Sequence, residues 1–146
     1  MNLYKTKLDL LIDISFQKKD EVSIILNICE NQHTLLTSTF KSDDILAYFK
    51  VLSDEKQNVV NTILSLDDAF NSNYEQCKDA FADENKDNYS CEIKTLQKII
   101  ASINDITSKI SLVEKSNELF ISKHSAHKTN AKNLEKLYNT KNIFND

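Results

Sequence analysis

The stretch DEKQNVVNTILSLDDAFNSNYEQCKDAFA, residues 54–82, decides the fold class. Its apolar residues recur in alternating steps of four and three, which is the spacing of an apolar seam along one face of a helix. We therefore expect a long helix that packs against other helices. The seam consists of Val59, Ile63, Leu66, Phe70, Cys77 and Phe81, with Tyr74 displaced by one position.

The same helical period continues on both sides of this stretch. A first helix is predicted over about Leu3 to Thr37, with a polar weak point at residues 17–21. Ser42 followed by two aspartates is typical of a helix start, because the side chains cap free N–H groups and favour the positive end of the helix dipole. Ser53-Asp54-Glu55 repeats this signature, so we expect a short helix over 42–52 and a break near Ser53, with one continuous helix as the alternative.

The second half of the chain predicts a linker and one more helix. Residues 83–88 contain no apolar side chain and form the expected linker. The last helix is predicted from Tyr89 or Ser90 to about Tyr138. The expected fold is therefore all-α, an elongated antiparallel helical bundle or coiled coil of three long helices plus one short helix. We expect a single domain over 1–138 and a flexible tail over 139–146.

Composition excludes many function classes. The 146 residues include no Gly and no Pro, and every one of the 18 basic residues is Lys. Loops that bind phosphate or dinucleotides need Gly for positive φ and for close approach of the backbone, so these motifs are excluded. A net charge of −4 argues against nucleic acid as a partner. We expect a cytoplasmic protein without membrane insertion, because no apolar run approaches about 20 residues and three cysteines form no disulfide framework.

No set of residues predicts catalysis, a cofactor or a metal site. His124 and His127 share a helix face, but the carboxylate and histidine ligands of a di-iron bundle are incomplete, so we interpret them as residues of a half-exposed seam. Cys29 and Cys77 fall on apolar seams, where a free cysteine behaves as a small apolar residue, and Cys91 is expected to be partly exposed. The sequence therefore favours a protein that is not an enzyme.

The end of the last helix is the candidate binding region. Asn117 interrupts an apolar stripe between Val113 and Phe120, and it is either a buried residue that fixes helix register or a local turn of the stripe toward solvent. Apolar residues beyond it spread over more than one face, as in a helix that receives an amphipathic partner. The residues expected to contact a client or partner are Asn117, Leu119, Phe120, Ile121, His124, Leu134, Leu137 and Tyr138.

The order of these segments resembles the FlgN-type flagellar export chaperones. The resemblance covers about Leu8 to Tyr138 and includes the start Ser42-Asp43-Asp44-Ile45-Leu46 and the stretch Ile63-Leu64-Ser65-Leu66-Asp67-Asp68-Ala69-Phe70. The last helix is similar to that family's final helix and its Glu/Asn pair, here Glu114 and Asn117. The polar stretch at 17–21 and the His124/His127 pair depart from the family's pattern.

The resemblance implies a cytoplasmic chaperone. Such proteins hold the C-terminal helices of hook-associated proteins, prevent premature assembly and deliver them to the flagellar export gate, and by position Tyr138 is the gate-docking tyrosine. Two alternatives stay open: a FliT-type chaperone of the filament-cap protein, and a structural coiled-coil protein that self-associates. The partners expected are therefore hook-associated proteins and the export gate, with a homodimer also left open.

Overall fold

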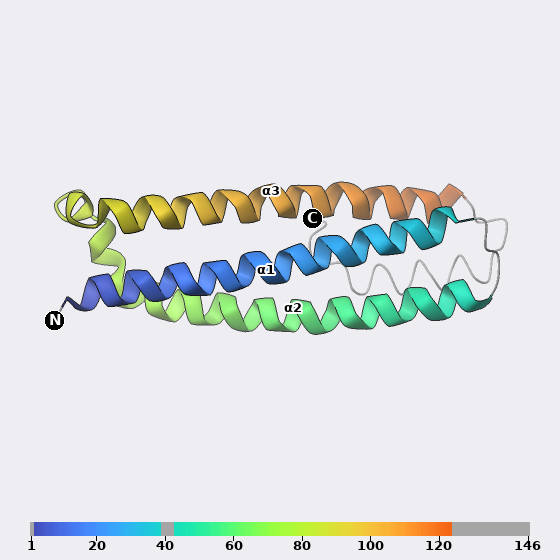
Figure 1. The fold of residues 1–146 in the computed structure, drawn as a ribbon, viewed down its shortest axis with the longest axis horizontal. Helices are drawn as coiled ribbons and strands as arrows, with labels where there is room; N and C mark the ends of the chain where they lie inside the picture. Colours follow the sequence, from blue (N-terminus) through green and yellow to red (C-terminus); the bar gives the residue numbers. More distant parts are fainter. Residues whose placement is uncertain (1, 39–42, 124–146) are drawn as a thin grey trace. The chain divides into compact units, whose positions relative to one another are not determined.

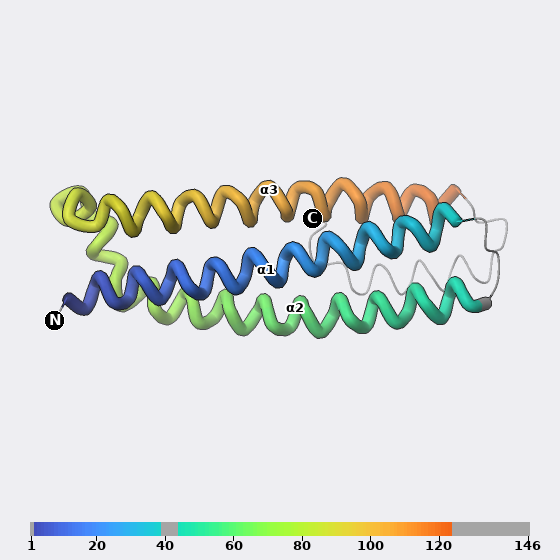
Figure 2. Tube along the Cα trace, viewed as in Figure 1, coloured from blue at the N-terminus to red at the C-terminus, as the bar shows by residue number. Residues whose placement is uncertain are grey.

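The chain folds as three long helices. The computed structural model describes residues 2–38 and 43–123, and all structural statements below concern these residues. Helix α1 spans Leu3–Thr37, α2 spans Asp43–Cys77 and α3 spans Ser90–Lys123 (Figures 1 and 2). Two short 3-10 helices, η1 (Lys78–Phe81) and η2 (Lys86–Tyr89), join α2 to α3. The described ranges contain no strand, so the predicted all-α bundle of three long helices is confirmed.

The predicted break near Ser53 is wrong, and α2 continues through it as one helix. No separate short helix precedes α2 within the residues that the structure describes. Ser53 is buried, and its hydroxyl accepts a hydrogen bond from Gln32 Nε2 at 3.0 Å. The polar residues that resemble a helix start are thus used inside the bundle, where packing outweighs local capping preference.

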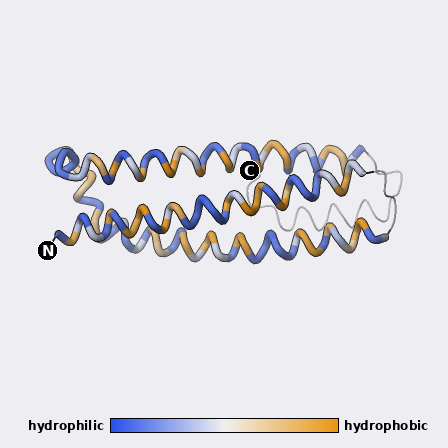
Figure 3. The backbone as a smooth tube through the Cα atoms, viewed as in Figure 1, coloured by the Kyte–Doolittle hydropathy of each residue, from blue (hydrophilic) through white to orange (hydrophobic). Residues whose placement is uncertain are grey.

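The polar stretch at residues 17–21 does not interrupt α1. Lys18 in this stretch pairs with Asp67 of α2, with 2.7 Å between Nζ and Oδ1. Hydrophobic and hydrophilic residues alternate along all three helices (Figure 3), as expected of helices that bury one face and leave the other in water.

The chain divides into two compact units, each of which contains a piece of every long helix. Within the described residues, unit 1 comprises 2–22 and 61–105, and unit 2 comprises 23–38, 43–60 and 106–123. The prediction of one domain over 1–138 with a tail over 139–146 reaches beyond the described residues and stays a prediction.

Unit 1 has an apolar core with an aromatic edge. Its buried cluster is packed against half-buried aromatic residues, among them Tyr4 and Tyr89, whose rings meet edge-on at 6.2 Å. Lys7 donates to Asn73 and Lys18 pairs with Asp67, so α1 and α2 run antiparallel here. The buried cluster consists of Leu8, Leu11, Cys77, Ala80 and Leu96.

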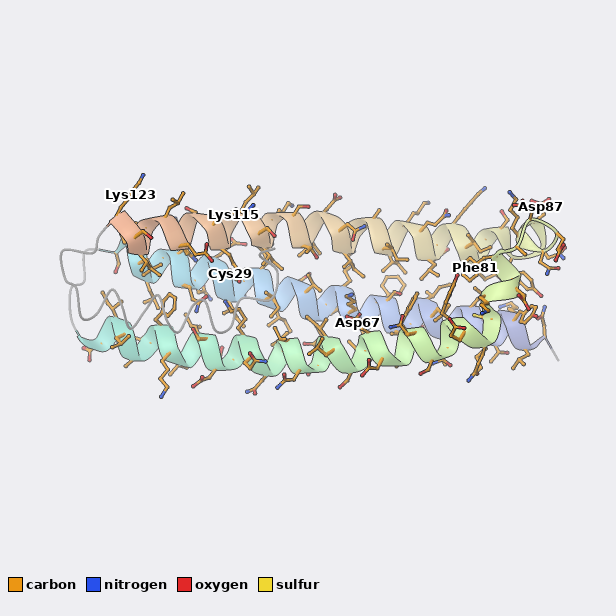
Figure 4. All side chains as sticks on the ribbon, turned by 180° about the vertical axis from the view of Figure 1, so that it is seen from behind. Cys29, Asp67, Phe81, Asp87, Lys115 and Lys123 are labelled. Atoms are coloured by element: carbon orange, nitrogen blue, oxygen red, sulfur yellow. The ribbon has the colours of Figure 1, made fainter. Side chains whose placement is uncertain are left out.

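The connection in unit 1 turns the chain without glycine. No residue in the described ranges has a positive φ. Instead, two 3-10 helices, which contain Phe81 and Asp87 (Figure 4), reverse the direction of the chain. The Asn85 side chain donates from Nδ2 to the carbonyl of Asp79 at 3.0 Å and closes the turn. A short polar side chain thereby does what Gly commonly does in such loops.

Unit 2 has a mixed interior, in which buried polar residues lie among buried apolar residues such as Ile25, Val60 and Ile110. Leu36, Phe49 and Ile121 form a small apolar cluster, with Phe120 packed against it. Contacts pair Cys29 with Glu114 and His33 with Asn117, so α1 and α3 run parallel. Among the described residues, no helix is both long and apolar enough to cross a membrane.

Candidate functional site

The structure places the predicted binding residues of α3 in three different environments. Asn117 and Ile121 are buried in unit 2, and Phe120 is half-buried against the apolar cluster. Leu119 is 58% exposed and so stands on the surface. The remaining predicted residues, His124, Leu134, Leu137 and Tyr138, lie outside the described residues, as does His127. Of the two interpretations of Asn117, the buried one is confirmed.

A buried ion pair lies at the centre of unit 2. Lys56 of α2 and Glu114 of α3 are separated by 3.1 Å between Nζ and Oε1, and both side chains are completely buried. A charge removed from water is tolerated only with a partner of opposite charge and further hydrogen bonds. These two side chains therefore bind α2 to α3 at a defined position along both helices.

Helix α1 contributes to the same polar cluster. The thiol of Cys29 lies 3.5 Å from Glu114 Oε1, within hydrogen-bonding distance for sulfur. Asn117 donates from Nδ2 to the backbone carbonyl of Cys29 at 3.3 Å, and its Oδ1 lies 2.7 Å from Nδ1 of His33. All three helices thus meet in one group of buried polar residues, to which Gln32 of α1 and Ser53 of α2 add a separate hydrogen bond.

Two acceptor oxygens in this group are buried without a hydrogen bond from a described residue, Gln32 Oε1 and Glu114 Oε2. Burial raises the pKa of Glu114, and the neighbouring ammonium of Lys56 opposes that rise. Burial also raises the pKa of Cys29 to about 12. At neutral pH the Cys29 side chain is therefore a thiol, which lacks the nucleophilic and metal-binding character of a thiolate.

The chemistry of this cluster is structural. Histidine, cysteine and acidic residues do not gather in threes at a candidate metal position anywhere in the described ranges. Cys29 and Cys77 are buried and Cys91 is exposed, as predicted. The network joins α1, α2 and α3 through hydrogen bonds and one ion pair.

Lys56, His33 and Gln32 are members of this group that sequence reasoning missed, and Lys56 is the most deeply buried charge among them. The buried positions of α2 include Phe49, Ser53, Lys56, Val60 and Ile63, which follow steps of four and three. When the predicted seam of Val59 and Ile63 is continued by three residues toward the N-terminal end of α2, the next position on it is Lys56. The signal was present, but a lysine on an apolar face is usually solvated and its partner is 58 residues away.

An open groove lies on the surface of unit 2, beside the network. Glu30, His33 and Thr34 of α1 line one side of it, and Leu112, Val113 and Ser116 of α3 line the other. The volume of this groove is about 350 Å³. His33 belongs to both features, because its ring lines the groove while Nδ1 contacts Asn117.

Leu112 and Leu119 add an exposed apolar line to this part of α3. They are 69% and 58% exposed and lie seven residues apart. This spacing places them on nearly the same side of the helix, about 10.5 Å apart along its axis. Figure 4 shows Lys123 projecting from the end of the same helix.

No protein-family model, no curated protein and no solved structure matches the chain.

Proposed function

We propose that the protein is a helix-binding export chaperone of the flagellar type III system. It acts in the cytoplasm, holds the C-terminal helices of hook-associated proteins, and delivers them to the export gate without any covalent step. The observation that carries the proposal is the apolar line of Leu112 and Leu119, which stays on the surface of a helical bundle. The resemblance of the segment order to FlgN-type chaperones gives the client class.

The physical basis is the helix-in-groove mode of recognition. An amphipathic client helix gains free energy when its apolar face leaves water, at about 25 cal/mol per Å² of buried apolar surface. The same face drives assembly of the client with its own kind, so covering it prevents premature assembly. Phe120 and Ile121 support this surface from beneath, since they pack in the cluster with Leu36 and Phe49.

The proposal is tested by mixing the purified chain with the C-terminal helical segment of a hook-associated protein. We expect a stoichiometric complex by size-exclusion chromatography with light scattering. Leu119→Asp is expected to abolish the complex, whereas Leu64→Asp, which alters a leucine that is 51% exposed in unit 1, leaves it intact. Equal binding by both variants, or no complex with the original chain, contradicts the proposal.

The same measurements separate the alternatives. A stable oligomer without client that Leu119→Asp converts to a monomer indicates a structural coiled-coil protein. Binding of the filament-cap protein in place of hook-associated proteins indicates the FliT type. Tyr138 remains our proposed contact with the export gate, on the resemblance alone.

A further inference from the structure

The groove of unit 2 has a polar character set by the buried network behind it. Asn117 is completely buried, and its Nδ2 donates to the Cys29 carbonyl, which assigns Oδ1 as the acceptor that faces His33. Because an oxygen acceptor requires a donor, Nδ1 of His33 carries a hydrogen. In the neutral ring, Nε2 is then an acceptor.

The other polar groups of the groove agree with this assignment. Glu30 supplies an acceptor carboxylate, and none of the six lining residues is a cation. Thr34 donates its hydroxyl hydrogen to the Glu30 carbonyl at 3.1 Å, so its free capacity at the oxygen is also for accepting. Apart from the hydroxyl of Ser116, which can donate as well as accept, the groove therefore offers acceptors and suits a ligand that brings donors.

The apolar residues define the shape of that ligand. Leu112 lines the groove and Leu119 continues the apolar line by two helical turns. At 100° per residue, Val113 lies on one side of this line, toward α1, and Lys115 lies on the other. Lys109 and Lys123 lie within about 60° of the line on the α1 side, but neither lines the groove. A partner helix along α3 thus meets the acceptors of the groove on its α1 side, between these two lysines.

We propose that this groove binds an amphipathic helix of a client protein through a Lys or Arg side chain that reaches Glu30 and His33. The client's apolar residues, spaced seven apart, cover Leu112 and Leu119. Charge complementarity therefore favours a client whose basic residue faces α1 at the level of Glu30. The identification of this partner as a client rests on the function proposed above, whereas the chemistry of the groove does not.

The test uses two synthetic helical peptides with the same leucine stripe, one with a single Lys on the edge that faces Glu30 and the other with Glu at that position. Fluorescence anisotropy with the full chain is expected to show at least about tenfold tighter binding of the Lys peptide, equivalent to about 1.4 kcal/mol. Glu30→Lys is expected to remove this preference. The matched charge reversal Asp68→Lys, at an exposed position of unit 1, is expected to keep it. Equal binding of both peptides overturns the inference.

A second measurement tests the network directly. Long-range ¹H–¹⁵N NMR spectra of the histidine rings distinguish the two neutral tautomers, and His33 is expected to carry its hydrogen on Nδ1. A hydrogen on Nε2 overturns the inference, because the groove then offers a donor where an acceptor is required. This measurement needs no variant and so does not depend on the folding of one.

The failures of the two proposals are distinguishable. If Glu30→Lys binds the hook-associated segment as the original chain does while Leu119→Asp does not, the groove inference is wrong and the proposed function stands. If the Lys peptide is preferred but hook-associated segments do not bind, the proposed function is wrong and the groove inference stands.

Discussion

Units 1 and 2 are built from the same three helices but differ in what their interiors contain. Unit 1 buries apolar side chains such as Leu8, Leu11 and Leu96 and places its ion pairs at the surface. Unit 2 buries a lysine, a glutamate, an asparagine, a glutamine and a serine. Five of the six buried polar residues in the described ranges therefore belong to unit 2.

This difference shows two ways to hold helices together. Apolar packing is strong and tolerant of small shifts, because contact area changes gradually with position. A buried ion pair adds little net stability but penalises any register that separates its charges. Both units bury apolar residues, and we infer that the polar residues of unit 2 in addition define how α1, α2 and α3 align beside the binding groove.

The difference between the two units is tested most strongly by removing one charge from an ion pair in each of them. Lys56→Met leaves Glu114 buried without its cation and is expected to lower the free energy of unfolding by about 3–5 kcal/mol. The matched variant Lys18→Met removes a partly exposed partner of Asp67 and is expected to cost about 0–1 kcal/mol. Urea unfolding followed by circular dichroism measures both values. Equal losses of unfolding free energy in the two variants would show that burial does not distinguish the two ion pairs.

Removing both buried charges separates register from stability. The double variant Lys56→Met with Glu114→Leu is expected to range from as stable as the original chain to about 1–4 kcal/mol more stable, because no charge is left to desolvate. A double-mutant cycle with the two single variants measures the coupling. If the double variant loses as much unfolding free energy as the two single variants together, the ion pair does more than align the helices, and the prediction is wrong.

Asn117 tests the weaker part of the network. Asn117→Ala leaves Nδ1 of His33 without its acceptor and is expected to cost about 1–3 kcal/mol. In unit 1, Asn73→Ala removes a half-buried acceptor of Lys7, and about 0.5–1.5 kcal/mol is expected. The unfolding measurement is the same for both variants. A smaller loss at Asn117 than at Asn73 would indicate that His33 finds another acceptor.

Much of the architecture follows from helical periodicity. The predicted bounds of α1 and the start of α3 at Ser90 agree with the structure, because apolar residues at helical spacing must face a common core. The break at Ser53 was mispredicted because capping signals are local, whereas burial of Ser53 against Gln32 depends on a distant helix. Residues 124–146 hold half of the predicted site, so that half remains a prediction.

The functional network was only partly predictable for a similar reason. Asn117 on an apolar stripe is unusual enough to be noticed in sequence. Lys56 does not stand out in the sequence, because a lysine on a helix usually faces water and no neighbouring residue indicates that Glu114 is its partner. The groove depends on the side-by-side placement of α1 and α3, which no single segment encodes.

The smallest predicted effect is the pH dependence of unit 2. It shows which influence on the pKa of Glu114 is larger, burial, which raises it, or attraction to Lys56, which lowers it. Burial raises the pKa of this carboxyl above its ordinary value of 4.5, despite the nearby Lys56. Glu114 therefore binds a proton more tightly in the folded chain than in the unfolded chain. Its protonation contributes fully to stability when the pH is below the ordinary pKa of 4.5, and this contribution is lost as the pH rises through the pKa of the folded state. The free energy of unfolding of the original chain, measured relative to Glu114→Gln, should increase as pH falls toward 4.5. A decrease would mean that attraction to Lys56 exceeds the cost of burial, so that the ion pair of unit 2 stabilises the fold as well as aligning it.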